Sequence, residues 1–104
     1  MIDRYEVACV IQDVVGEKYI HKKDSDTRWE EFIFPNHKIV LVYIPKNEFE
    51  VPPCLVFTLE GFFPINIRIP LNAELEDVMN LIHFSEVMLK WQTDLGQQVN
   101  GRPV

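Results

Sequence analysis

Residues 72–91 are the only segment of this 104-residue chain whose apolar residues recur with the period of a long α-helix. Asn72 stands in front of the repeat, where an asparagine side chain can accept the free backbone N–H groups of a first helical turn. Glu76 and Asp77 place negative charge at the positive end of the helix dipole, and Gly96 offers a stop. The pattern predicts a carboxy-terminal helix capped by Asn72 and ended at Gly96.

Residues placed at about 100° intervals divide this helix into three stripes. One stripe is apolar and wide enough to pack on a sheet: Leu75, Val78, Met79, Ile82 and Leu89. A second stripe is polar and suited to solvent: Glu76, Asn80, His83, Glu86 and Lys90. The third stripe is apolar again and lies away from the first: Phe84, Met88 and Trp91. The helix therefore carries more apolar surface than covering one sheet requires.

Two interpretations of the third stripe remain open. Phe84, Met88 and Trp91 can pack against the rim of the sheet, a proline-rich loop or the tail. Alternatively, they stay exposed as an aromatic and methionine patch, which is typical of protein interfaces. Phe49 lies between two glutamates in the proline-rich segment 45–53 and joins them as a candidate for partner binding. We predict that these four residues form a partner-binding surface.

The chain before the helix is predicted to form strands. The expected strands are residues 4–14, 18–22, 27–34, 38–44, 54–59 and 63–69. In residues 4–14 the apolar residues alternate as Tyr5, Val7, Cys9 and Ile11, which indicates a half-buried strand. Residues 38–44 are apolar on both faces, so they belong in the centre of a sheet that is covered twice or has a second, exposed apolar face.

Short turns join these strands, and short connections make neighbouring strands antiparallel. The sequence therefore predicts an α+β fold, with a five- to six-stranded antiparallel β-meander covered by one C-terminal α-helix. We expect residues 1–96 to form a single globular domain and residues 97–104 to form a loosely ordered tail. Such a chain is large enough to fold without a disulfide or metal ion.

The net charge of −6 is uneven, since residues 48–104 hold eight acidic and three basic residues. This balance disfavours nucleic acid, whose phosphates are bound by Lys and Arg, and suits a basic protein partner. We expect no membrane span, because no apolar run approaches about 18 residues. The two cysteines, Cys9 and Cys54, are expected to be free, and the amino terminus lacks a secretory signal pattern. We therefore expect a cytoplasmic protein.

Candidate chemistry is sparse. His21, Asp24 and Asp26 cluster potential metal ligands in one turn, but the further ligands and the glycine of a calcium loop are missing. Cys54 and His37 are a conceivable nucleophile and base, but burial of Cys54 in an apolar strand would make its thiol inert. Glu30 and Glu31 point to opposite faces of a strand and cannot act together. We expect no catalytic residue, no cofactor and no bound metal.

Three hypotheses follow. The first is a small acidic protein–protein interaction module, such as an inhibitor, immunity-like or adaptor protein, that binds a partner or forms a homodimer through the helix or a strand edge. The second is a small-ligand-binding domain with a pocket between sheet and helix, lined by Trp29, Phe32, Tyr43 and Phe57. The third is a metal-dependent enzyme that uses the cluster in the 21–26 turn. The first is preferred, because catalytic motifs are absent and apolar residues exceed the needs of a core.

Overall fold

The computed structural model describes residues 1–46, 51–61 and 64–100, and the side chains of all of these except 92 and 96–100. Two α-helices enclose a series of strands in the chain. In order, the elements are α1 (Arg4–Val15), β1 (Ile20–Lys23), β2 (Glu30–Phe34), the 3-10 turn η1 (Pro35–His37), β3 (Ile39–Ile44), β4 (Cys54–Leu59), β5 (Ile65–Pro70) and α2 (Leu75–Asn100).

The strands form one five-stranded antiparallel sheet in the order β1-β2-β3-β4-β5, so every strand pairs with its neighbour in sequence. β3 lies at the centre, where Ile39 pairs with Leu59 and Ile44 pairs with Cys54 on β4. This arrangement confirms the predicted α+β class and the β-meander with its C-terminal helix. The central position of β3 follows from its run of β-branched residues, which pack well on a pleated surface.

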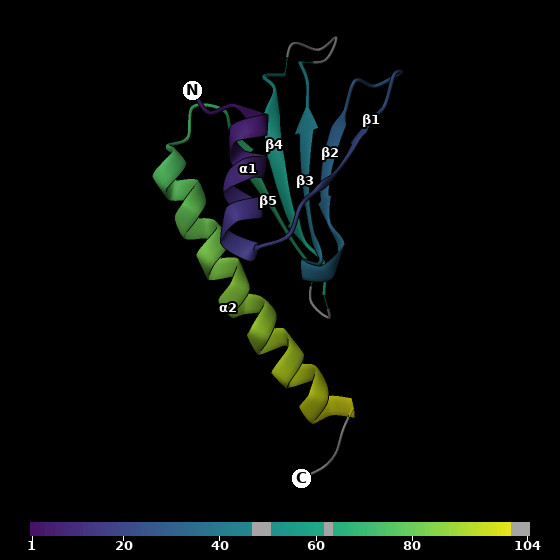
Figure 1. The fold of residues 1–104 in the computed structure, drawn as a ribbon, viewed down its shortest axis with the longest axis vertical. Helices are drawn as coiled ribbons and strands as arrows, with labels where there is room; N and C mark the ends of the chain where they lie inside the picture. The colour runs from purple at the N-terminus through teal and green to yellow at the C-terminus, as the bar shows by residue number, and fades with distance from the viewer. Residues whose placement is uncertain (47–50, 62–63, 101–104) are drawn as a thin grey trace.

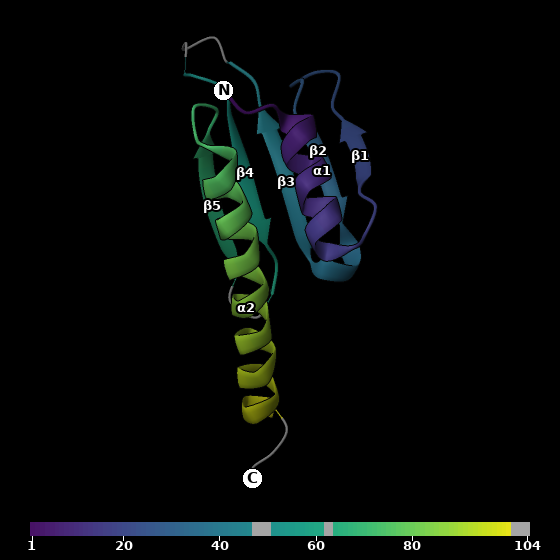
Figure 2. The same cartoon turned by 60° about the vertical axis from the view of Figure 1, so that its left-hand side comes forward.

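Both helices lie on the same face of the sheet (Figures 1 and 2). In Figure 2, α1 lies in front of β2 and β3, and α2 lies in front of β4 and β5. The core fills the space between this face and the helices. Its fully buried side chains include Val7 and Ile11 of α1, Phe32 and Phe34 of β2, Leu41 of β3, Leu55, Phe57 and Leu59 of β4, and Ile82 of α2.

The prediction of a strand at residues 4–14 is wrong, because these residues form α1. Val7 and Ile11 are four residues apart, which is compatible with both a strand and a helix. The ends of the segment decide between them. The carboxylate of Asp3 accepts hydrogen bonds from the N–H groups of Tyr5 and Glu6, and Gly16 closes the helix in the left-handed conformation with φ +74°. The capping residues thus outweigh the strand-like composition of residues 4–14. The resulting helix α1 covers half of the sheet.

The second face of the sheet is not covered by any element in the described part of the chain (Figure 1). Val40 and Val42 of β3 and Val56 of β4 lie on this face, with side chains half-buried by their neighbours. The residues that alternate with these along the strands, such as Leu41, face the helices and are fully buried. Of the two expectations for residues 38–44, a second exposed apolar face is therefore the correct one.

The limits of α2 differ from the predicted ones at both ends. The helix begins at Leu75, and Asn72 lies in a turn in which the N–H of Ala73 donates to the carbonyl of Pro70 at 3.0 Å. Asn72 is therefore not the cap, and the carbonyl of Glu74 accepts the first helical hydrogen bond, from Val78, at 3.2 Å. The helix also continues past Gly96 to Asn100, since a glycine inside a helix costs only about 1 kcal/mol.

The length of α2 gives the molecule its shape. Twenty-six residues at about 1.5 Å each make a helix of about 39 Å. Its carboxy-terminal half extends beyond the end of the sheet (Figures 1 and 2). The radius of gyration is 15.2 Å, compared with about 13 Å for a compact chain of this length. Neither α1 nor any other helix in the described ranges is long and apolar enough to cross a membrane.

Candidate functional site

The predicted binding residues on α2 are mostly exposed. Phe84 is 55% exposed and Trp91 is 59% exposed, so neither packs against the sheet. Met88 is half-buried and contacts the core cluster along one side. Phe49, the fourth predicted residue, lies outside the described residues. For Phe84 and Trp91 the structure therefore favours the exposed interpretation over packing at the rim.

Two further residues extend this surface. Val87 is 44% exposed and Leu95 is 42% exposed. Leu95 was missed by sequence reasoning, although it follows Trp91 by four residues and so repeats the helical spacing. We refer to the resulting set as the α2 stripe: Phe84, Val87, Met88, Trp91 and Leu95. Such a contiguous apolar surface on a helix is characteristic of docking sites, whereas single exposed apolar residues are common on any protein.

A different side of α2 holds the helix against the sheet. Val78 and Ile82 are 2% and 0% exposed, and the buried hydroxyl of Ser85 donates to the carbonyl of Ile82 at 2.6 Å. Met79, predicted to belong to this face, is 39% exposed instead. The core face of α2 is therefore narrower than predicted. The α2 stripe does not contribute its aromatic side chains to this face.

Charged residues near the α2 stripe are mainly acidic. Glu76 and Asp77 precede it, and Asp94 lies between Trp91 and Leu95. His83 lies beside Phe84, with its Nδ1 3.6 Å from an oxygen of Glu86. In the described part of α2, Lys90 is the one lysine or arginine. The surface around the stripe is thus apolar with an acidic border.

A second candidate is the buried carboxylate of Glu30 at the start of β2. Glu30 is 1% exposed, and its side chain faces α1. One carboxylate oxygen accepts a hydrogen bond from the Nε of Arg4 at 3.1 Å. The other lies 2.8 Å from the hydroxyl of Tyr5, which donates to it, and 3.0 Å from Nε2 of His21 on β1. Lys23 adds a fourth contact at 4.0 Å. Three elements therefore meet at this carboxylate.

The environment of Glu30 keeps its carboxylate charged. Burial alone raises the pKa of a carboxyl group, but here hydrogen bonds from Tyr5 and His21 and the positive charges of Arg4 and Lys23 outweigh burial and lower the pKa of Glu30. The hydrogen bond to Glu30 in turn raises the pKa of the Tyr5 hydroxyl. Arg4 is further fixed by the ring of Tyr43, which lies 4.2 Å from its guanidinium carbon.

This arrangement suits a structural role more than catalysis. A general base needs a pKa near the working pH and a free lone pair, and the carboxylate of Glu30 has a lowered pKa and is surrounded by donors. Sequence reasoning missed this cluster. The sequence did hold an indication of it. Residues two apart in a strand point to the same face, so Glu30 points into the core together with Phe32 and Phe34. Glu31 faces the other side, as predicted.

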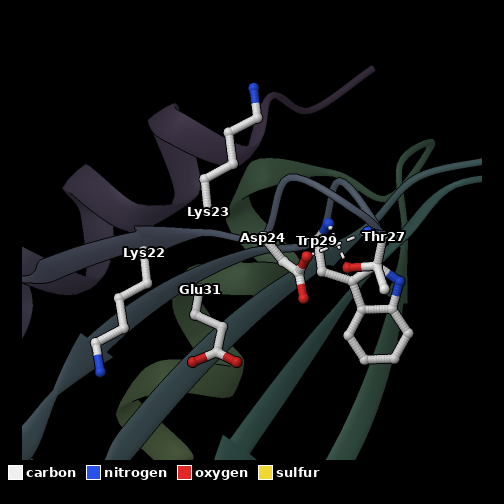
Figure 3. Close-up of a pocket in the computed structure, with 6 residues that line it drawn as sticks. All are labelled: Lys22, Lys23, Asp24, Thr27, Trp29 and Glu31. Atoms are coloured by element: carbon white, nitrogen blue, oxygen red, sulfur yellow. Dashed lines mark hydrogen bonds between the residues drawn. The ribbon is translucent and has the colours of Figure 1, made fainter.

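An open hollow of about 420 Å³ lies along the β1–β2 hairpin (Figure 3). Trp29 forms one wall, and the side chains of Lys22 and Glu31 point to the same side of the sheet, away from Lys23. The predicted ligand pocket is not assembled here. Phe32 is fully buried in the core, as is Phe57, whereas Trp29 is 44% exposed. Tyr43 packs against the same core. Three of the four aromatic residues proposed to line the pocket therefore belong to or border the core, and Trp29 lies apart from them.

The residues of the candidate metal cluster, His21, Asp24 and Asp26, also separate. The carboxylate of Asp24 accepts hydrogen bonds from the N–H groups of Asp26 and Thr27 at 2.8 and 3.3 Å, which closes the hairpin turn and lowers the pKa of Asp24. His21 turns instead toward Glu30. In residues 1–46, 51–61 and 64–100, no three His, Cys, Asp or Glu side chains are placed to hold a metal ion.

The conceivable nucleophile and base are far apart. Cys54 pairs with Ile44 at one end of β3, and His37 precedes the other end. His37 is bound by Glu17, with 2.8 Å between Nδ1 and the carboxylate, and this contact lowers the pKa of Glu17. Both cysteines are free, and Cys54 is buried whereas Cys9 is exposed on α1.

Comparisons of the chain with protein families, with curated proteins and with solved structures find no match.

Proposed function

We propose that this protein is a protein–protein interaction module whose docking surface is the α2 stripe. The observation that carries the proposal is the exposure of Phe84 and Trp91, which are 55% and 59% accessible beside a core that is complete without them. Burial of such rings in a partner removes a large apolar area from water. Selection for stability alone gives no reason to keep them there.

The scaffold of the stripe supports this role. Phe84 and Trp91 lie on one helix, whose first half is fixed to the sheet by Val78 and Ile82. A surface on a rigid helix loses little conformational entropy when it binds, because its backbone is already ordered. Aromatic residues also dominate the binding energy of many interfaces. The α2 stripe thus combines the composition and the rigidity expected of a docking helix.

The chemistry of the border suggests the kind of partner. Glu76, Asp77 and Asp94 lie near the apolar residues, so a partner with an apolar strip and nearby positive charge would match them. The same charges oppose a nucleic acid backbone. A cytoplasmic location fits this proposal, because Cys9 and Cys54 are both free, as thiols are in reducing compartments.

The test compares three forms of the chain as immobilised bait in extracts and in mixtures with itself. The first is the unaltered protein, the second carries Phe84→Glu and Trp91→Glu, and the third carries Met79→Glu as a control. Met79 is 39% exposed on the same helix but on another side, so it matches the chemical change outside the stripe. Intact folding of each form is checked by circular dichroism.

We expect one protein, another chain or a second copy, to be retained in stoichiometric amount by the unaltered form and the control but not by the double variant. Retention that is equal for all three forms would place binding elsewhere on the molecule. Retention by none of them would refute the proposal.

A further inference from the structure

The apolar residues of α2 have a spacing that reads the same from both ends. Phe84, Met88, Trp91 and Leu95 are separated by four, three and four residues. An identical helix running in the opposite direction presents the same spacing in the same order. Alternating steps of three and four residues also form the seam along which two helices pack knobs into holes. The α2 stripe is therefore complementary to itself in an antiparallel pair.

Charge complements the apolar seam on one flank. His83 and Asp94 are eleven residues apart, or close to three full turns, so they lie on the same side of α2. They are equally far from the midpoint between Met88 and Leu89. The centre of the apolar seam lies one residue further along, between Leu89 and Lys90. In an antiparallel pair centred on the seam, His83 of each helix lies two residues, or about 3 Å along the axis, from the position opposite Asp94 of the other. The imidazole of His83 then lies near that carboxylate as well as near its own Glu86, whose oxygen is 3.6 Å from Nδ1.

The shape of the molecule permits this pairing. The carboxy-terminal half of α2 extends past the sheet in Figures 1 and 2. Two such helices can lie side by side while the two sheets remain at opposite ends. A parallel pair would instead bring both sheets to the same end and would place His83 of one helix and Asp94 of the other on opposite sides of the pair. Geometry and charge thus favour the antiparallel orientation.

We propose that two copies of this chain associate through α2 in an antiparallel pair with a two-fold axis between Leu89 and Lys90. Phe84 of each copy packs against Leu95 of the other and Met88 against Trp91, with His83 of each copy near Asp94 of the other. The surface is the same on both copies, as in any two-fold interface. This inference rests on the proposed function, because it names the protein that covers the α2 stripe.

The extent of the contact sets its strength. The seam spans twelve residues on each helix, from Phe84 to Leu95, so we expect it to bury less than the roughly 1,200–2,000 Å² of a specific, stable interface. The dimer is therefore expected to dissociate reversibly, with a dissociation constant in the micromolar range. Analytical ultracentrifugation of the pure chain, from low micromolar to several hundred micromolar concentration, measures this equilibrium.

The first experiment tests the apolar seam. We expect Phe84→Glu and Trp91→Glu each to weaken dimerisation by about a hundredfold or more, because each places a charge in the centre of the contact. Met79→Glu adds the same charge to another side of the helix and should leave the dissociation constant within about threefold of the original. Circular dichroism and thermal unfolding establish that all variants fold.

The second experiment tests orientation and register. His83→Asp places two carboxylates near each other twice per dimer and should weaken association by about tenfold. Adding Asp94→Lys to this variant restores opposite charges in the antiparallel pair and should return the dissociation constant to within about threefold. A dimer that is weakened by His83→Asp but not restored by the second change would overturn the proposed register.

The outcomes separate this inference from the proposed function. A chain that stays monomeric at all concentrations, but whose stripe variants lose binding to a different protein, refutes the homodimer and leaves the interaction module intact. A monomer whose stripe variants also bind every partner as the original does refutes both. A dimer that is equally sensitive to Met79→Glu and Trp91→Glu refutes the α2 seam.

Discussion

The hydroxyl of Tyr5 on α1 donates a hydrogen bond to the buried carboxylate of Glu30 on β2 across 2.8 Å. The two residues are separated by 25 positions in the chain, and their contact ties the amino-terminal helix to the edge of the sheet. Arg4 and His21 bind the same carboxylate at 3.1 and 3.0 Å. A single buried charge therefore organises the junction of α1, β1 and β2.

Replacing Glu30 by alanine should lower the free energy of unfolding by about 2–4 kcal/mol, because the partners of the carboxylate lose a charged acceptor and a buried gap remains. Glu31 is the matched control, since it lies next in sequence but faces the other side of the sheet. Glu31→Ala should change the stability by no more than about 0.5 kcal/mol. Urea denaturation measures both variants, and equal losses would contradict a special role for Glu30.

Stability should fall as the pH is lowered through the acid range. The network lowers the pKa of Glu30 below its ordinary value of 4.5, so the unfolded state takes up a proton at a higher pH than the folded state. The stabilising contribution is complete above about pH 5 and is lost as the pH falls through the folded pKa.

Glu30→Gln tests the origin of this pH dependence, because glutamine keeps the size of the side chain without a titrating group. Unfolding measured between pH 7 and pH 3 should show a smaller loss of stability in this variant than in the original protein. Parallel curves would mean that other carboxyl groups with a lowered pKa, such as Glu17 and Asp24, cause the dependence.

Truncation of Phe84 should leave the fold intact. Phe84 is 55% exposed, so Phe84→Ala should change the free energy of unfolding by no more than about 0.5 kcal/mol. Phe57 is the contrasting residue, because it is 1% exposed in the core, and Phe57→Ala should cost about 3–5 kcal/mol. The two variants are compared by denaturation at a protein concentration at which any self-association is negligible. A large loss for Phe84→Ala would mean that the ring belongs to the core.

Replacing Gly16 by alanine should cost about 1 kcal/mol of stability. Gly16 has φ +74°, a backbone conformation that strains a residue with a side chain, although no atom within 4 Å would meet an added Cβ. The cost is thus conformational, without a steric clash. Asp13→Ala, at an exposed position inside α1, is the control and should be neutral or slightly stabilising. Thermal unfolding of both variants distinguishes backbone strain from a general effect of alanine in α1.

Much of the sheet was predicted from sequence, whereas the segment that forms α1 was wrongly predicted to be a strand. β3 and β4 were predicted within a residue of their limits, because residues 39–44 and 54–59 are rich in β-branched and aromatic side chains and are bounded by turn-forming residues. In α1, the four-residue spacing of Val7 and Ile11 fits both the period of a strand and the period of a helix, and the valines of this segment favour a strand. The caps at Asp3 and Gly16 were the stronger signal, and the need to cover half of the sheet made a helix the stable outcome.

The candidate sites were predictable to different degrees. The α2 stripe was found through helical spacing, but spacing cannot say whether an apolar side chain is covered, because coverage depends on elements distant in sequence. The Glu30 network was missed for a related reason. The alternation of side chains along β2 points Glu30 toward the core. The partners that make its burial tolerable lie on α1 and β1, and the prediction placed Arg4 and Tyr5 of α1 in a strand.

The sequence by itself determined the order of β1 to β5, the antiparallel pairing and the three stripes of α2, since these depend on local periodicity and on short connections. Only the tertiary structure decided that both helices share one face of the sheet and that Phe84 and Trp91 remain exposed. The physical reason is that burial is a property of the whole packed chain. An apolar side chain is hidden only where another element fits over it, and no element in the described part of the chain covers Trp91.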